Sequence, residues 1–164
     1  MKTYEEFYNI CRKNYIDQGE DPDQKINLYK MDKNLPSEVE NNVKNWLKSP
    51  YDEETKNVIK SLIKENPDML ADMFHTNISF GTGGMRGIMG VGTNRVNKYT
   101  FGKTTQGLSN YINSQFPNET PRVVIGYDCR HNSKELAQTV ADILSANSIK
   151  VYLFTDLRST PEVS

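Results

Sequence analysis

The sequence predicts an α/β fold, in which a helical N-terminal segment precedes a partial, mixed or mostly parallel sheet with flanking helices. Two observations support this fold class. Up to about residue 75, apolar residues recur three or four positions apart, as they do along helices. From residue 77 onward, apolar runs of strand length alternate with longer helical patterns. We therefore expect a helical extension over residues 1–76 and an α/β domain over residues 77–164.

Each helix of the N-terminal segment is predicted from a capping residue followed by apolar residues at helical spacing. Two capping boxes, with Glu three positions after Ser or Thr, are formed by Thr3 with Glu6 and by Ser37 with Glu40. Asp52 is expected to cap a third helix, and Asn66 followed by Pro67 predicts the start of a fourth. The inward-facing apolar residues of the third helix are expected to be Val58, Ile59, Leu62 and Ile63.

The second half of the chain begins with a short strand, expected over residues 77–80, and a helix over residues 96–116. The apolar side of this helix is predicted to carry Phe101, Leu108, Tyr111 and Ile112. Gly102 and Gly107 weaken a helix by roughly 1 kcal/mol each relative to alanine. Close packing against a neighbouring element is therefore the expected reason for these two glycines.

A βαβ unit is predicted next. Residues 122–128, RVVIGYD, and residues 149–154, IKVYLF, read as two buried strands. The helix between them is expected to begin at Ser133 as its cap, and its inward residues are predicted to be Leu136, Val140, Ile143 and Leu144. This order favours parallel pairing of the two strands. Thr160 and Pro161 then predict the cap and first turn of another helix, and we expect a chain that stops there to continue in nature.

Composition excludes several classes of function. The 20 Lys and Arg residues balance 21 Asp and Glu residues, so no basic excess indicates nucleic acid or a membrane as partner. Cys11 and Cys129 lie far apart, without the spacing of a disulfide framework or a zinc site. No apolar run approaches the roughly 18 to 20 residues of a membrane span. Acidic residues stand where a signal peptide has its apolar region, so a cytoplasmic location is expected.

A glycine-rich stretch, FGTGGMRGIMG over residues 80–90, holds five glycines around Arg86. Glycines let a ligand approach the backbone closely, and an arginine fork suits phosphate or carboxylate. The spacing excludes two nucleotide motifs, because Arg86 replaces the last glycine of G-x-G-x-x-G, and Asn97 stands where a P-loop ending at Gly102 needs glycine. A structural connection in which Arg86 forms a salt bridge remains the alternative.

A second polar cluster, Asp128, Arg130, His131 and Ser133, follows the first predicted strand of the βαβ unit. Open α/β sheets bind ligands at the carboxyl ends of their strands. Ser133 fits a helix cap better than a nucleophile, His131 fits an exposed turn, and Asp128 with Arg130 fits the orientation of a neighbouring loop. The sequence shows no Ser/His/Asp triad pattern and no carboxylates at metal-ligand spacing.

Three stretches in order, residues 80–112, VVIGYDCRHNS at residues 123–133 and STPEVS at residues 159–164, resemble the α-D-phosphohexomutases. The similarity is closest to the phosphoglucomutase/phosphomannomutase branch with a helical N-terminal extension. The resemblance implies a four-domain enzyme that interconverts hexose 1-phosphate and 6-phosphate through a phosphoserine. Magnesium and a hexose bisphosphate are implied as cofactors of the complete enzyme.

The resemblance also assigns expected roles to residues of this chain. Arg86 matches the arginine of the family's FGT-x-G-x-R-G motif and is expected to be catalytic. Residues expected to bind substrate or shape the cleft are Gly81, Thr82, Gly83, Gly84, Gly87, Asp128 and Arg130. Gly126 and Ser133 complete the family's G-x-D-x-R-x-x-S motif, and Arg95 is expected to be structural or peripheral.

The family's phosphoserine loop, its aspartate-rich magnesium loop and its phosphate-gripping domain have no counterpart in the 164 residues. We therefore expect an N-terminal part of a mutase, truncated within the first α/β domain and inactive alone. Its implied partners are a sugar phosphate and the missing C-terminal domains. The alternative is a stand-alone module that binds a sugar phosphate or docks a partner without catalysis.

Overall fold

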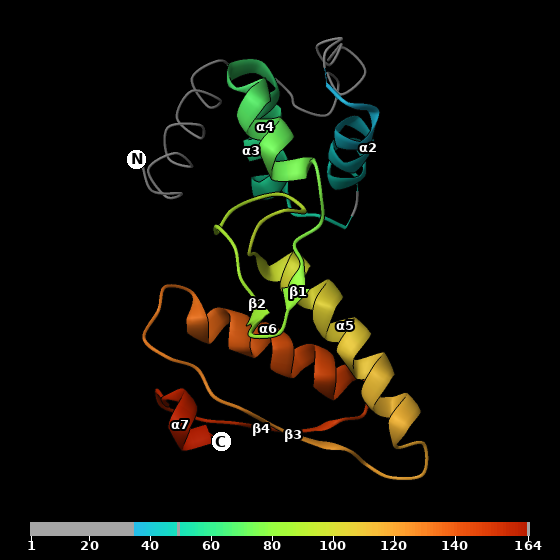
Figure 1. Cartoon of the computed structure of the whole chain (residues 1–164), viewed down its shortest axis with the longest axis vertical. Helices are drawn as coiled ribbons and strands as arrows, with labels where there is room; N and C mark the ends of the chain where they lie inside the picture. The colour runs from blue at the N-terminus through green and yellow to red at the C-terminus, as the bar shows by residue number, and fades with distance from the viewer. Residues whose placement is uncertain (1–34, 49, 164) are drawn as a thin grey trace. The chain divides into compact units, whose positions relative to one another are not determined.

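The computed structural model describes residues 35–48 and 50–163 of the chain (Figure 1). The chain divides into two compact units, with the boundary between Val96 and Asn97. The predicted capping box of Thr3 and Glu6, and the helix expected to follow it, lie outside the described residues. None of the described helices is both long and apolar enough to cross a membrane.

Three helices form the described part of the first unit: α2 (Ser37–Trp46), α3 (Glu53–Glu65) and α4 (Pro67–Phe74). Two of the predicted caps are confirmed. The Asp52 carboxylate accepts a hydrogen bond from the Thr55 backbone N–H at 2.7 Å, and Pro67 occupies the first turn of α4 behind its cap Asn66. These bonds satisfy backbone N–H groups that have no partner within the helix.

The predicted capping box at Ser37 is wrong. Pro36 occupies the N-cap position of α2 with an extended backbone, so Ser37 is already the first helical residue. No side-chain bond caps this helix, and the Glu40 carboxylate instead accepts from Lys44 one turn later, at 2.5 Å. The helix therefore begins one residue earlier than its serine suggests.

The core of the first unit is built around aromatic side chains. The Trp46 ring stacks on Tyr51 at a centroid distance of 4.5 Å and meets Phe74 edge-on at 5.5 Å. The Asn42 side-chain amide donates to the Phe74 carbonyl at 2.9 Å, which ties α2 to the end of α4. The other buried apolar residues are Val39, Val43, Val58, Ile59, Leu62, Leu70, Met73 and Val91.

The strand expected over residues 77–80 is much shorter than predicted. Only Phe80 belongs to a strand, β1 (Phe80–Gly81), which pairs antiparallel with β2 (Gly84–Met85). Ile78 does not pair with another strand, because its backbone N–H donates to the Thr93 carbonyl at 2.8 Å. The segment before the glycines is thus held by a loop, not by a sheet.

The second unit contains α5 (Lys98–Gln115), β3 (Arg122–Ile125), α6 (Ser133–Ala146), β4 (Lys150–Leu153) and α7 (Thr160–Val163). The predicted βαβ unit is confirmed, since β3 and β4 pair in parallel from Arg122 with Lys150 to Ile125 with Leu153. Figure 1 shows α5 and α6 on one side of the strand pair and α7 beside one end of it.

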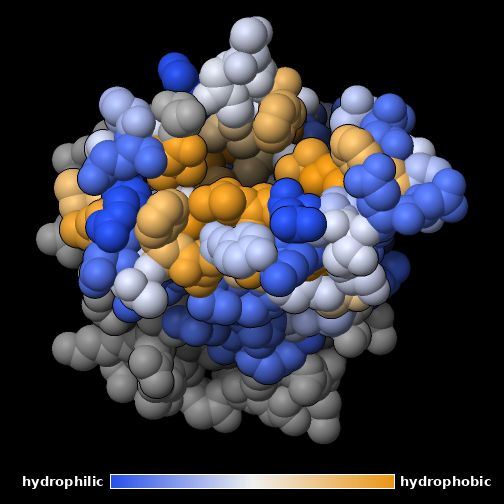
Figure 2. Space-filling view, turned by 90° about the horizontal axis from the view of Figure 1, so that it is seen from below, coloured by the Kyte–Doolittle hydropathy of each residue, from blue (hydrophilic) through white to orange (hydrophobic). Residues whose placement is uncertain are grey.

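Both strands were predicted to be buried, and the structure corrects this. Exposure alternates along each strand, with Val124 53% exposed and its partner Tyr152 46% exposed. Figure 2 views the molecule from below and shows apolar surface gathered near its centre. Among the described residues, the helices α5 and α6 cover one face of this sheet and leave the other largely open.

The apolar side predicted for α5 is wrong for Leu108 and Tyr111, while Phe101 and Ile112 are half-buried. Leu108 is 46% exposed and Tyr111 62% exposed, whereas the buried side chains include Thr105 and Ser109. Both hydroxyls donate to the backbone carbonyl four residues earlier at 2.8 Å, so burying them leaves no unpaired donor.

Close packing is confirmed for Gly102 alone. A Cβ on Gly102 would lie 3.2 Å from the Ile143 Cδ1 atom, while a Cβ on Gly107 would meet no atom within 4 Å. The contact joins α5 to α6, where Leu144 is fully buried and Ile143 half-buried. Gly107 therefore has no packing reason among the described residues.

The caps of the last two helices are shifted by one residue from the prediction. Asn132, in a left-handed conformation, precedes α6, and Ser133 is the first helical residue. Ser159, not Thr160, stands at the start of α7, where the Glu162 carboxylate accepts from the Ser159 backbone N–H at 2.7 Å and from its hydroxyl at 2.9 Å. A serine with glutamate three positions later is the capping-box pattern.

Candidate functional site: the glycine-rich hairpin

The glycine-rich stretch folds into a tight hairpin. Gly81 pairs with Gly84, and Thr82 and Gly83 form the turn between the two short strands. Gly84 has a φ of +97°, a conformation that side-chain-bearing residues rarely adopt. The glycine at this position is therefore required by the backbone, whatever its role toward a ligand.

Arg86 lies directly after the hairpin, and its guanidinium rests on Gly83. A Cβ on Gly83 would lie 2.8 Å from the Arg86 Nη2 atom and 3.3 Å from Cζ. Arg86 is exposed, and among the described residues it forms no hydrogen bond or ion pair. The salt bridge that a purely structural arginine would make is thus not found in the described part of the chain.

The stem of the hairpin is held from both sides by residues 93–96. On the leading side, the Ile78 N–H donates to Thr93 O, and the Thr93 hydroxyl donates to Thr76 O at 2.6 Å. On the trailing side, the Val96 N–H donates to Ile88 O at 2.9 Å. One loop therefore grips the chain both before and after Arg86.

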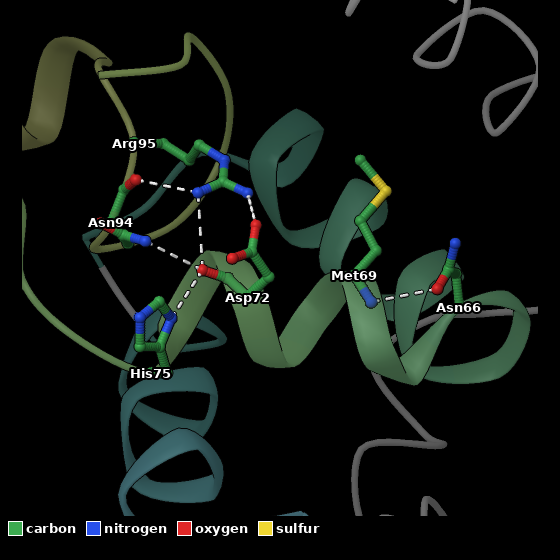
Figure 3. Close-up of polar contacts among 6 residues, drawn as sticks. All are labelled: Asn66, Met69, Asp72, His75, Asn94 and Arg95. Carbon is green, nitrogen blue, oxygen red and sulfur yellow. Dashed lines mark hydrogen bonds and ion pairs between the residues drawn. The ribbon is translucent and has the colours of Figure 1, made fainter. Parts of the chain in front are cut away.

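The same loop is anchored to the end of α4 by Arg95 (Figure 3). The Arg95 residue is only 5% exposed, and its Nη2 forms an ion pair with the Asp72 carboxylate. Its Nη1 donates to the Asn94 carbonyl at 3.0 Å and reaches the Asp72 carbonyl at 3.5 Å. The structural role expected for Arg95 is therefore what the contacts show.

Gly92 brings the loop against the same helix end. Its φ is +120°, and a Cβ there would lie 2.4 Å from the Met73 carbonyl oxygen. The Asn94 backbone N–H donates to that carbonyl at 3.0 Å. No side chain fits at Gly92 unless the loop moves away from α4.

The Asp128 cluster belongs to the second unit and follows the carboxyl end of β3, as the sequence predicts. The Asp128 carboxylate accepts from the Arg130 backbone N–H at 3.2 Å and from its Nε at 2.7 Å, and the Ser133 hydroxyl accepts from the Asp128 N–H at 3.3 Å. The Arg130 backbone N–H is the main cause that lowers the pKa of Asp128 below its ordinary value. The Arg130 side chain is 84% exposed, so its charge faces solvent.

Local sequence reasoning singled out the glycine-rich stretch and the Asp128 cluster, but it predicted no hairpin and missed the role of Asp72. Asp72 and Arg95 stand 23 positions apart, and no spacing rule joins an aspartate near a helix end to an arginine in a later loop. No group of three or more His, Cys, Asp or Glu side chains that would suit a metal ion occurs within residues 35–48 and 50–163.

Comparison with known proteins identifies the family of this sequence. Residues 77–164, more than half of the chain, match the family model of phosphoglucomutase/phosphomannomutase, alpha/beta/alpha domain I. No solved structure matches the chain significantly.

Among curated proteins, a phosphoglucomutase of Staphylococcus aureus strain MRSA252 is 38% identical over 120 residues, which cover 73% of this chain and 21% of that protein. A phosphoglucomutase of Staphylococcus epidermidis is 47% identical over 90 residues, covering 55% of this chain and 16% of that protein. The chain thus spans about a fifth or less of the length of these relatives. It belongs to the phosphoglucomutase/phosphomannomutase family, whose first α/β domain it matches over residues 77–164.

Proposed function

We propose that this chain supplies the N-terminal part of a phosphoglucomutase/phosphomannomutase, in which Arg86 binds the phosphoryl group during its transfer between sugar and phosphoserine. The observation that carries the proposal is an exposed guanidinium without a described partner, set on Gly83 within the matched residues. Fixed cations stabilise the charge of a transferring phosphoryl group without reorganising during the reaction.

The neighbouring residues have supporting roles in this proposal. The bare backbone of Gly81, Gly83 and Gly84 lets a sugar phosphate approach Arg86 closely. Asp128 holds the Arg130 loop in shape through two hydrogen bonds, and we propose that this loop helps to shape the substrate cleft of the complete enzyme. Gly87 would keep the stem narrow, since a Cβ there would lie 2.9 Å from Ile78 Cδ1.

Other parts of the proposal rest on the family. The relatives indicate a class of enzyme that uses metal, and we propose magnesium and a hexose bisphosphate for the complete protein. The described residues offer no cluster of carboxylates for the ion, so no step through a metal is assigned to them. A helical extension ending at residue 76 and a cytoplasmic location also remain predictions. The family model begins at residue 77, whereas the compact units divide after Val96.

The test is Arg86→Ala in the full-length enzyme that contains these residues, assayed for conversion of glucose 1-phosphate to glucose 6-phosphate. We expect kcat/KM to fall about a hundredfold or more, as it does in other enzymes that lose a hydrogen-bond donor to the transition state. Lys103→Ala, which removes an exposed cation from α5, is the matched control and is expected to leave kcat/KM unchanged. Near-normal turnover of Arg86→Ala would remove Arg86 from the catalytic group.

A non-catalytic binding module makes a different prediction for the 164 residues alone. Such a module would bind glucose 1-phosphate saturably through Arg86, and Arg86→Ala would abolish the binding. Under our proposal the isolated chain neither converts the sugar phosphate nor binds it tightly, because further phosphate contacts lie outside this chain.

A further inference from the structure

Four polar contacts converge on the C-terminal turn of α4. The Asp72 carbonyl accepts from Arg95 Nη1 at 3.5 Å and from the Asn94 side-chain amide at 3.1 Å, and His75 Nδ1 lies 2.9 Å from it (Figure 3). The Met73 carbonyl accepts from the Asn94 backbone N–H. The last carbonyls of a helix lack partners within the helix, so the loop satisfies groups that α4 leaves open.

Charge strengthens this attachment. α4 has no basic residue in its last turn, and Arg95 brings a cation to the negative end of the helix dipole. The Arg95 side chain is 6% exposed and its partner Asp72 60% exposed, so the arginine is the desolvated member of the pair. A buried guanidinium without its carboxylate is costly, which makes Asp72 important to the position of Arg95.

Arg95 lies between the two loop residues that grip the hairpin stem. Thr93, two residues before it, holds Ile78, and Val96, the next residue, holds Ile88. A displacement of Arg95 therefore reaches the stem on both sides of Arg86. Gly92 adds a contact too close to α4 for any side chain, which leaves the loop little freedom to shift as a whole.

We infer that Asp72 and Arg95 are positioning residues, whose ion pair fixes the Arg86 hairpin against α4 and so sets where the Arg86 guanidinium stands. Asp72 precedes the part of the chain that matches the family model, whereas Arg95 and Arg86 lie within it. The Asp72 side chain, together with the carbonyls of Asp72 and Met73, thus links the helical segment to the site. The importance of this for turnover rests on the proposed function, but the positioning itself does not.

The test compares Asp72→Asn, which keeps the shape and removes the charge, with the unchanged 164-residue chain by NMR. We expect amide hydrogen exchange at Ile78 and Val96 to quicken about tenfold or more, because both amides depend on the anchored loop. The Arg86 side-chain Nε–Hε resonance is expected to shift. Leu62, inside α3, is expected to keep its exchange rate.

Two further variants sharpen the result. Glu40→Gln breaks an exposed ion pair of the same unit, between Glu40 and Lys44, and is expected to change none of these signals. Arg95→Lys keeps the charge but loses the fork, and is expected to give intermediate exchange. If Asp72→Asn fails to fold, the same exchange measurement on Arg95→Lys decides the question.

The outcomes are distinct. Selective loosening at Ile78 and Val96 supports the inference. Unchanged exchange there, or an equal rise at Leu62, overturns it. Turnover of the complete enzyme is measured separately: normal turnover with a loosened hairpin would contradict the proposed role of Arg86 and leave the positioning intact.

Discussion

Gly83 shows how a single missing side chain can set the place of a functional group. A Cβ at this position would stand 2.8 Å from Arg86 Nη2, but the atom it meets is the far end of a flexible side chain. The hairpin can therefore accept alanine by swinging the guanidinium away. The substitution would therefore displace the Arg86 guanidinium without lowering the stability of the fold.

We predict that Gly83→Ala leaves the free energy of unfolding within about 0.5 kcal/mol of the parent, as for an ordinary surface change. In the complete enzyme it is expected to lower kcat about tenfold or more, because a small misplacement of a charged group is costly in catalysis. Gly107→Ala is the control for the kinetics, since Gly107 lies on α5 outside the hairpin and a Cβ there meets no atom within 4 Å. Equal kinetics for both variants would contradict the argument.

At this same scale, sequence alone singled out Arg86 but not the residues that support it. Arg86 stands out because five glycines surround it within eleven residues. The ion pair of Asp72 and Arg95 forms because a loop folds back onto the end of a helix. No regular spacing of residues in the sequence predicts such a contact. The role of Arg86 in catalysis stays a prediction.

At the scale of helices and strands, caps were predicted well where two signals agreed. Asn66 was followed by Pro67, and Asp52 preceded a clear apolar periodicity, and both caps are present. Ser37, Ser133 and Thr160 were each predicted as a cap, and each proved to be the first helical residue. Each helix begins one residue earlier than predicted, because the residue before it, Pro36, Asn132 or Ser159, occupies the N-cap position.

The difference between a true and an apparent cap can be measured in the first unit. Asp52→Ala is expected to lower the free energy of unfolding by about 1 kcal/mol, because Thr55 loses its acceptor. Ser37→Ala is expected to change it by only a few tenths of a kcal/mol, since α2 has no side-chain cap bond. Urea unfolding followed by the fluorescence of Trp46, the single tryptophan, reports on this unit. A loss for Ser37→Ala as large as that for Asp52→Ala would contradict the structure.

The first turn of α7 should respond to acid through Glu162. The Ser159 backbone N–H, and then its hydroxyl, hold the pKa of Glu162 below its ordinary value of 4.5. A lowered pKa in the folded state means that the charged form stabilises the turn. The stabilisation is therefore present above pH 4.5 and is lost as the pH falls through the lowered pKa. NMR chemical shifts of residues 160–163 across this range are expected to move toward coil values. Glu162→Gln should abolish that pH dependence, and its persistence in this variant would exclude Glu162 as the cause.

At the scale of the molecule, the order of elements was predictable and the burial of their faces was not. The βαβ unit follows from a change of apolar period along the chain, which is a local property. Whether both faces of a strand are covered depends on layers supplied by distant segments. The apolar residues within 122–128 and 149–154 suggested buried strands, yet Val124 and Tyr152 are about half exposed in the described structure. An α/β/α domain has helices on both sides of its sheet, whereas α5 and α6 lie on the same side of β3 and β4.

This open face leads to a prediction for the 164-residue chain as it stands. Val124 and Tyr152 are direct partners across the strands, and Leu157 and Val163 are also exposed, at 54% and 38%. Exposed apolar patches of this kind favour association, so we expect the isolated chain to self-associate with rising concentration.

The variant Val124→Lys tests this prediction, because it adds a charge beside Arg122 and Lys150 at the centre of the face. It is expected to weaken association about tenfold or more, since apolar burial is lost and like charges repel. Leu108→Lys makes the same change at a 46% exposed position on α5 and is expected to have little effect. Light scattering across a concentration series measures both variants, with circular dichroism to show that each is folded. If the two substitutions weaken association equally, the surface responsible is not the open face of β3 and β4.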